Sequence, residues 1–123
     1  MLKKTKRSIK WIKRKNPLFA HSPLFTRSKK YAGMHLIAEF WSGRIIEEPK
    51  EIKRILIEAA KNSNNTPLEV TIHKFSPQGI TGVILLAESH IALHSWPELN
   101  YLAIDIFTCG SKAMPKKALE YLK

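Results

Sequence analysis

Apolar and polar residues follow strand-like patterns over most of the chain between residues 34 and 109. Two segments alternate between apolar and polar side chains, which is typical of strands with one buried face. Two others are almost continuously apolar, and residues 90–96 run on from the segment before them until Pro97 ends the pattern. We therefore expect strands at 34–41, 68–75, 80–89, 90–96 and 101–109.

Two helices are expected, each beginning at a proline that suits the first helical turn. The first begins at Pro49, and its apolar residues recur at helical spacing, which predicts one buried stripe. The residues of this stripe are Ile52, Ile55, Leu56, Ala59 and Ala60. The second helix is expected from Pro115 to Leu122.

The expected order β-α-β-β-β-β-α favours an α+β fold, a two-layer sandwich with helices packed on one face of an antiparallel sheet. Strand alternation assigns to the helix side Leu68, Val70, Ile72, Leu102, Ile104 and Ile106. The opposite face is expected to carry Thr71, His73, Phe75, Asp105, Phe107 and Cys109. That set is too aromatic for an ordinary solvent-facing surface, so we expect a partner subunit or a ligand to cover it.

The net charge of +11 is concentrated at one end of the chain. Residues 1–38 contain eleven Lys and Arg and no acid, whereas the rest of the chain has ten basic and ten acidic residues. Residues 1–32 are therefore expected to be a flexible basic extension, with a short amphipathic helix over 2–15. Such an arm is typically a solvated extension, or it contacts nucleic acid or an anionic membrane. Alternatively, Met34 is the true start of the protein.

The 123 residues are enough for one small domain, expected at 33–123. A lone cysteine, Cys109, excludes a disulfide within the chain and fits a reducing compartment. No apolar run approaches the roughly 18–20 residues that a membrane-spanning helix needs. We therefore expect a cytoplasmic protein.

The dipeptide Glu88-Ser89 is the strongest candidate for chemistry. A serine hydroxyl can attack the carbonyl of the residue before it and form an ester, and loss of the serine Cα proton then breaks the chain. Such chemistry needs a base and hydroxyl or amide donors, and His94 and Thr81 supply these residue types at short range. Taken alone, each of these residues, like Cys109, is far more often structural.

Several segments together resemble the S-adenosylmethionine decarboxylase proenzyme family, in its short prokaryotic class. The resemblance covers about residues 33–122. The segments that carry it are GMHLIAEF (33–40), HKFSPQGITG (73–82), AESHIALHSWPE (87–98) and AIDIFTCG (103–110).

The resemblance implies that the chain cleaves itself between Glu88 and Ser89. Ser89 would become a pyruvoyl group that forms a Schiff base with the substrate. His94 would be the base in processing and Cys109 the general acid that protonates the product. Thr81 would be the hydroxyl helper, where the family usually has serine. No metal and no pyridoxal phosphate is implied.

The resemblance also implies the substrate, S-adenosylmethionine, whose decarboxylated product serves spermidine biosynthesis. Phe75 and Trp96 lie where the family stacks the aromatic base, and a sulfonium cation suits aromatic faces. Glu98 lies where the ribose hydroxyls bind, and Glu39 lies near the pocket. The family implies a homodimer with active sites between the protomers.

Two alternatives remain at this stage. The same fold and cofactor would also serve the decarboxylation of L-ornithine or L-arginine. A protein of another class, a non-catalytic homologue, would bind nucleic acid through its basic arm.

Overall fold

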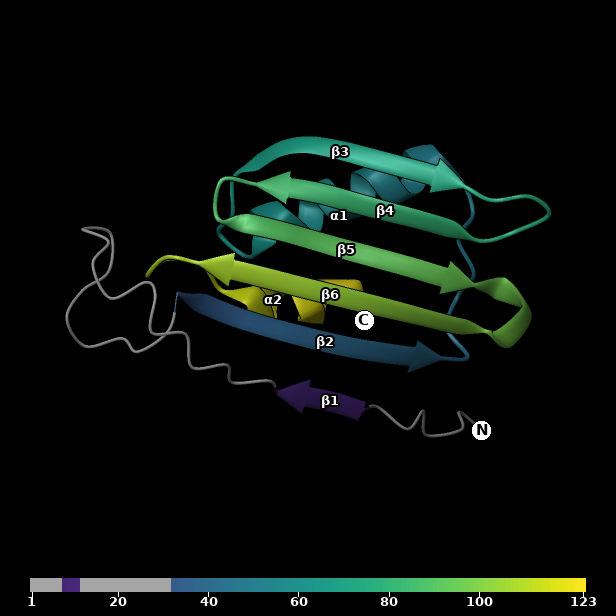
Figure 1. Cartoon of the computed structure of the whole chain (residues 1–123), viewed down its shortest axis with the longest axis horizontal. Coiled ribbons are helices and arrows are strands. Elements are labelled where there is room, and N and C mark those ends of the chain that lie inside the picture. Colours follow the sequence, from purple (N-terminus) through teal and green to yellow (C-terminus); the bar gives the residue numbers. More distant parts are fainter. Residues whose placement is uncertain (1–7, 12–31) are drawn as a thin grey trace.

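A six-stranded antiparallel sheet with two helices on one face forms the part of the chain that the computed structural model describes, residues 8–11 and 32–123 (Figure 1). The strands lie in the order β1-β2-β6-β5-β4-β3. The elements are β1 (Ser8–Trp11), β2 (Gly33–Trp41), α1 (Pro49–Asn62), β3 (Pro67–Lys74), β4 (Ile80–Leu86), β5 (Ser89–Trp96), the 3₁₀ turn η2 (Pro97–Leu99), β6 (Tyr101–Cys109) and α2 (Pro115–Leu122). The predicted α+β sandwich is confirmed.

Helix α1 begins at Pro49 as predicted, and hydrogen bonds satisfy backbone groups at both of its ends. The Glu48 carboxylate accepts a hydrogen bond from the Lys50 amide, and Pro49 occupies the first turn, where no amide partner is needed. At the other end the Ser63 hydroxyl donates to the carbonyl oxygens of Ala59 and Ala60, at 2.8 and 3.0 Å. The predicted stripe is buried except for its member Ile55, which is only partly covered.

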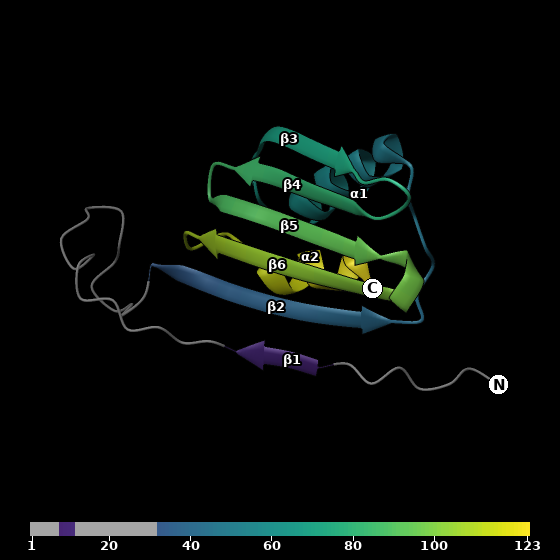
Figure 2. The ribbon, with the colours of Figure 1, turned by 45° about the vertical axis from the view of Figure 1, so that its right-hand side comes forward.

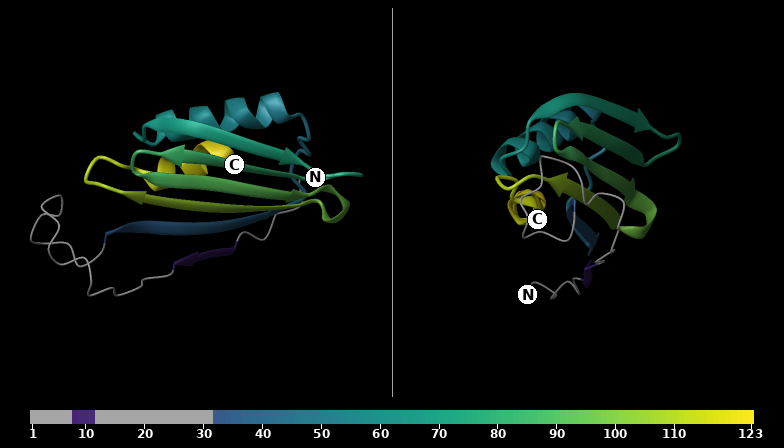
Figure 3. Two further views of the ribbon diagram at one scale, coloured as in Figure 1. Left: turned by 45° about the horizontal axis from the view of Figure 1, so that its top comes forward. Right: turned by 60° about the vertical axis from the view of Figure 1, so that its left-hand side comes forward.

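The side views show both helices on one side of the sheet (Figure 3). The hydrophobic core lies between these two layers. Ile91 and Ile106 lie opposite each other on β5 and β6, and both are fully buried beneath the helices. Leu56 of α1 is equally buried, and a Cβ on Gly82 of β4 would meet its Cδ1 at 3.0 Å. The absence of a side chain at residue 82 therefore lets α1 approach the sheet closely.

The predicted continuity between residues 80–89 and 90–96 is wrong. Strand β4 ends at Leu86, the chain reverses over two residues, and Leu86 pairs with Ser89 at the start of β5. An apolar run does not reveal this reversal, because both strands are covered by helices on one side and the apolar residues continue as far as Ala87, the first residue of the turn. The two segments are thus neighbouring antiparallel strands.

Two further expectations need correction. Leu68 is 61% exposed, because a β-bulge shifts the register between Pro67 and Glu69 and turns its side chain away from the helices. Residues 8–11 form strand β1 on the edge of β2, rather than part of a helix over 2–15. The hydrogen bonds that residues 8–11 form with the open edge of β2 favour a strand there, although the sequence pattern is helical. The other residues of 2–15 lie outside the described part of the chain.

Within residues 32–123 neither α1 nor α2 is long and apolar enough to cross a membrane.

Leu56→Ala is expected to lower the free energy of unfolding by about 2–5 kcal/mol, because it removes a fully buried side chain between α1 and β4. Urea denaturation followed by circular dichroism measures the change. The control Leu68→Ala alters an exposed leucine and is expected to change stability by less than about 0.5 kcal/mol. Equal losses in the two variants would contradict this arrangement of the core.

Candidate active site

Figure 2 shows the face of the sheet without helices, here the open face. Strand alternation and register place most of the candidate residues on it. They form two groups at opposite ends of β5. The group at its start, the cleavage end, comprises His35, Ser89, His90, Asp105 and Cys109. The group at its finish, the aromatic end, comprises Glu39, Trp41, Phe75, Thr81, His94, Trp96 and Tyr101.

At the cleavage end, hydrogen bonds hold both the main chain and the side chain of Glu88. Its carbonyl oxygen accepts from the Cys109 amide at 3.0 Å. Its carboxylate accepts from the Thr66 amide at 2.8 Å and from the Thr66 hydroxyl at 3.0 Å. The Thr66 carbonyl in turn accepts from the Ala87 amide at 3.0 Å. The reversal between β4 and β5 is therefore fixed from both sides, by the start of β3 and by the end of β6.

Ser89 has a strained backbone. Its φ of 147° lies in a region that favours glycine, and such conformations cost about 1–3 kcal/mol. The tight reversal and the pairing of Ser89 with Thr108 of β6 impose this conformation. The Ser89 hydroxyl lies 3.2 Å from Nδ1 of the His90 ring. The peptide bond between Glu88 and Ser89 thus joins a fixed carbonyl to a strained serine.

Two histidines share one carboxylate oxygen beside Ser89. Nε2 of His35 lies 2.6 Å from Oδ1 of Asp105, and Nε2 of His90 lies 3.4 Å from the same atom. Both rings also contact Phe107, with centroid distances of 5.4 and 6.3 Å. The four side chains come from β2, β5 and β6, and all are partly buried.

Sequence reasoning placed Asp105 and Phe107 on this face but missed His35 and His90. The missing information was the register between strands, because the pairing of β5 and of β2 with β6 brings His90 and His35 opposite Phe107. Thr66 was also missed, since its contacts with Glu88 join residues 22 positions apart. A histidine directly after the proposed nucleophile was the available signal for His90.

At the aromatic end, Thr81 and His94 lie in contact as neighbours on β4 and β5. The Thr81 hydroxyl is 3.0 Å from His94 Nδ1. The His94 ring lies 6.2 Å from Trp96, and the Trp96 ring lies 5.4 Å from Tyr101. A row of rings therefore extends across the ends of three strands, with Trp41 as its last member at 5.2 Å from Tyr101.

Tyr101 connects this row to an acid. Its hydroxyl donates to Oε1 of Glu39 at 2.9 Å. Burial raises the pKa of Tyr101 above its ordinary value, and the hydrogen bond to the Glu39 carboxylate raises this pKa further. Tyr101 therefore remains a neutral donor that holds the Glu39 side chain against the sheet.

The remaining predicted binding residues lie on loops at the same end. The Phe75 ring follows β3, is 49% exposed, and packs edge-on against His73 at 4.5 Å. The Glu98 carboxylate in η2 accepts a hydrogen bond from the Gln78 side chain at 3.0 Å. The fold thus gathers Phe75, Trp96 and Glu98 around one end of the open face.

The two groups do not meet within one chain. Ser89 and His94 are five residues apart on β5, which corresponds to about 17 Å at about 3.3 Å per residue. The structure therefore brings Ser89 together with Cys109 and the scissile carbonyl, and it brings His94 together with Thr81. It separates these two sets.

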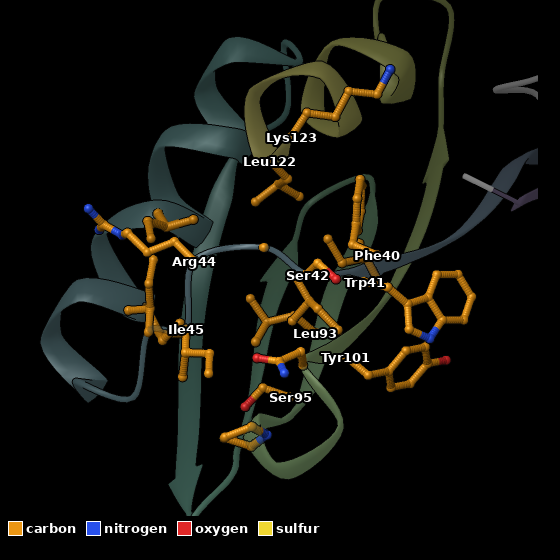
Figure 4. A pocket seen from close by; sticks show the side chains of 18 of the residues that line it. Phe40, Trp41, Ser42, Arg44, Ile45, Leu93, Ser95, Tyr101, Leu122 and Lys123 are labelled. Atoms are coloured by element: carbon orange, nitrogen blue, oxygen red, sulfur yellow. The ribbon is translucent and has the colours of Figure 1, made fainter. Parts of the chain in front are cut away.

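A cavity of about 560 Å³ opens on the helix side of the sheet, near the finish of β5 (Figure 4). Its lining includes Leu93, Leu122 and Lys123, and the rings of Trp41 and Tyr101 lie side by side at its margin. Neither Ser89 nor Cys109 lines it. The cavity is therefore separate from the cleavage end.

Glu39→Gln is expected to lower the pKa of Tyr101 toward its ordinary value, because the acceptor loses the charge that opposes ionisation of the phenol. Ultraviolet absorbance titration, taken as the difference from Tyr101→Phe, isolates this one tyrosine. Glu69→Gln changes an exposed carboxylate on β3 and is expected to leave the titration unchanged. An unaltered curve for Glu39→Gln would contradict the contact.

Comparison with known proteins identifies the family. The family model described as S-adenosylmethionine decarboxylase matches residues 34–123. The S-adenosylmethionine decarboxylase proenzyme of Moorella thermoacetica is 45% identical over 92 residues, 73% of this chain and 74% of the relative. That of Methanococcus vannielii is 42% identical over 96 residues, 76% and 79% of the two chains.

A solved structure gives the same result. The crystal structure of the adenosylmethionine decarboxylase from Aquifex aeolicus superimposes with a TM-score of 0.68 at 34% identity, and the match covers 74% of this chain and 77% of that one. The resemblance seen in the sequence is confirmed by the family model, the relatives and the fold. The chain belongs to the prokaryotic S-adenosylmethionine decarboxylase proenzyme family.

Proposed function

We propose that the chain cleaves itself between Glu88 and Ser89, and that Ser89 becomes the pyruvoyl group with which it decarboxylates S-adenosylmethionine. The hydrogen bond from the Cys109 amide to the Glu88 carbonyl carries this proposal. The carbonyl that the serine hydroxyl would attack therefore already accepts a hydrogen bond. The chain is a carboxy-lyase of spermidine biosynthesis by its family.

The residues at the cleavage end fit the formation of a pyruvoyl group. Attack by the Ser89 hydroxyl places negative charge on the Glu88 carbonyl oxygen, where the Cys109 amide stabilises it. The strain at Ser89 raises the energy of the intact chain and is released when the bond breaks. Removal of the Ser89 Cα proton then expels the Glu88 carboxylate, and water hydrolyses the resulting dehydroalanine to a pyruvoyl group and ammonia.

We assign removal of the Cα proton to His94 of a second copy, assisted by the hydroxyl of Thr81. The distance along β5 prevents His94 from reaching Ser89 of its own chain. Two open faces packed with their strands in opposite directions would bring the cleavage end of one copy to the aromatic end of the other. Large apolar side chains exposed on that face support such a homodimer, among them Leu85, Trp96 and Trp41 at 49%, 40% and 38% exposure.

The pyruvoyl group supplies an electron sink as carbon dioxide leaves the substrate. In the proposed site Phe75 and Trp96 stack against the aromatic base and the sulfonium cation. Glu98 accepts hydrogen bonds from the ribose hydroxyls, and Glu39, held by Tyr101, lines the same end. Cys109 lies beside the cleaved bond, from where it protonates the product carbon.

We assign the decarboxylase domain to residues 33–123 and treat residues 1–32 as a basic extension, of which β1 adds a strand to the sheet edge. The lone thiol of Cys109 supports a cytoplasmic location, because reducing conditions keep it free for catalysis.

Purified protein is expected to separate into fragments of 88 and 35 residues, the shorter one beginning with a pyruvoyl group. Ser89→Ala removes the nucleophile, so this variant is expected to remain one chain without activity. Intact-mass spectrometry reports cleavage, and release of carbon dioxide from S-adenosylmethionine reports the reaction. Cleavage of Ser89→Ala would overturn the proposed self-cleavage. Release of carbon dioxide from L-arginine or L-ornithine but not from S-adenosylmethionine would overturn the proposed substrate.

Thr66→Val is expected to slow self-cleavage about 2- to 10-fold, because it removes one of the hydrogen bonds that hold Glu88. A time course of fragment formation after cell-free synthesis measures the rate. Thr66→Ser keeps the hydroxyl and is the matched control, with a rate expected near that of the unaltered chain. If valine and serine behave alike, the Thr66 hydroxyl does not position the bond.

A further inference from the structure

We propose that His90 is the base that accepts the Ser89 hydroxyl proton when the ester forms, and that Asp105 and His35 position its ring. This inference rests on the proposed self-cleavage and concerns its first step. His94 retains the later step, removal of the Cα proton. The two proton transfers would then use two different histidines.

The geometry is that of a serine activated by a neighbouring imidazole. Nδ1 of His90 lies 3.2 Å from the Ser89 hydroxyl oxygen, within reach of the proton that must leave. If Nδ1 accepts this proton, Nε2 carries the other hydrogen, and Nε2 lies 3.4 Å from Oδ1 of Asp105. A nucleophile, a base and a carboxylate that orients the base are the three parts of a catalytic triad, which is recognised by roles and distances.

The position of Asp105 is itself restrained. His35 lies 2.6 Å from the same carboxylate oxygen, and the Phe107 ring packs against both histidines. These contacts come from β2 and β6, the two strands beyond β5 on this side. On the other side, His90 pairs with the apolar Leu85 of β4. The strand register therefore orients the ring toward Asp105.

The step balances without any further reactant. The Ser89 oxygen forms a bond to the Glu88 carbonyl carbon, and its proton passes to Nδ1 of His90. The resulting oxyanion accepts from the Cys109 amide. When the bond from that carbon to the Ser89 nitrogen breaks, the nitrogen takes the proton back from His90. The product is an ester with a free amine on Ser89, and His90 returns to its neutral form.

The alternative base is too far away within the chain. His94 lies about 17 Å along β5 from Ser89, so it reaches this serine only from a second copy. His90 is in place before any dimer forms. Ester formation by His90 would therefore precede or accompany assembly, whereas elimination by His94 would require it.

Hydroxylamine separates the two steps, because it cleaves esters at neutral pH and leaves ordinary peptide bonds intact. The test compares the unaltered chain, His90→Asn and His94→Ala by intact-mass spectrometry with and without hydroxylamine. The asparagine side chain places a hydrogen-bonding oxygen near the position that Nδ1 of His90 occupies, but it is not a base. His90→Asn is expected to cleave at least about 100-fold more slowly and to resist hydroxylamine. His94→Ala is expected to accumulate the ester. Hydroxylamine is expected to cleave this ester and to leave a fragment that begins with an unmodified Ser89.

His73→Asn is the matched control. This histidine lies on the same face, at the edge strand β3, and its ring contacts Phe75 rather than Ser89. Its rate of cleavage is expected to equal that of the unaltered chain. Circular dichroism and thermal melting of each variant establish that it is folded.

Asp105→Asn tests the positioning role, and it also serves if His90→Asn does not fold. It is expected to slow ester formation about 10-fold or more. The fraction of the ester that goes on to elimination is expected to stay the same. A purely structural defect would disturb both steps. Added imidazole is expected to restore cleavage of His90→Ala, since a small base fills the space that the ring leaves.

The inference is overturned if His90→Asn forms a hydroxylamine-sensitive ester at the unaltered rate. It is also overturned if Asp105→Asn changes only the elimination step. If the unaltered chain neither cleaves nor yields to hydroxylamine, the proposed self-cleavage fails, and this step fails with it.

Discussion

The tight reversal between β4 and β5 is the constraint on which the candidate site depends. Two residues, Ala87 and Glu88, must connect neighbouring strands that are each also paired with a further strand, β4 with β3 and β5 with β6. Thr66 binds the turn from the β3 side, and the Cys109 amide binds it from the β6 side. Since neither neighbour can yield without losing its own pairing, the strain is confined to Ser89, at a φ of 147°.

The register of β5 and β2 on β6 determines what lies beside Ser89. Antiparallel pairing places His90 next to Phe107 and close to Asp105, and the register between β2 and β6 adds His35. The sheet thus collects an acid and two imidazoles around one hydroxyl without any loop. A rigid sheet suits the proposed self-cleavage, because a reaction of the protein's own backbone requires no substrate to enter or leave.

The length of β5 has a different consequence. It separates the cleavage end from the aromatic end by about 17 Å, although His90 and His94 of the two groups both lie on the open face. The proposed second copy would bring the two ends together. It would also cover aromatic and aliphatic side chains whose exposure to water is unfavourable. Completion of the active site and burial of this face are therefore one event in the proposed homodimer.

The sequence by itself determined the strand and helix periods, the side of the sheet that the helices cover, and the family. These depend on local alternation, proline positions and short motifs such as residues 87–98. Only the tertiary structure decided where the chain reverses, that a bulge turns Leu68 outward, and that β1 joins the sheet edge. It also decided the grouping of His35, His90 and Asp105. Each of these depends on hydrogen-bond register between distant strands, which hydrophobic periodicity does not encode.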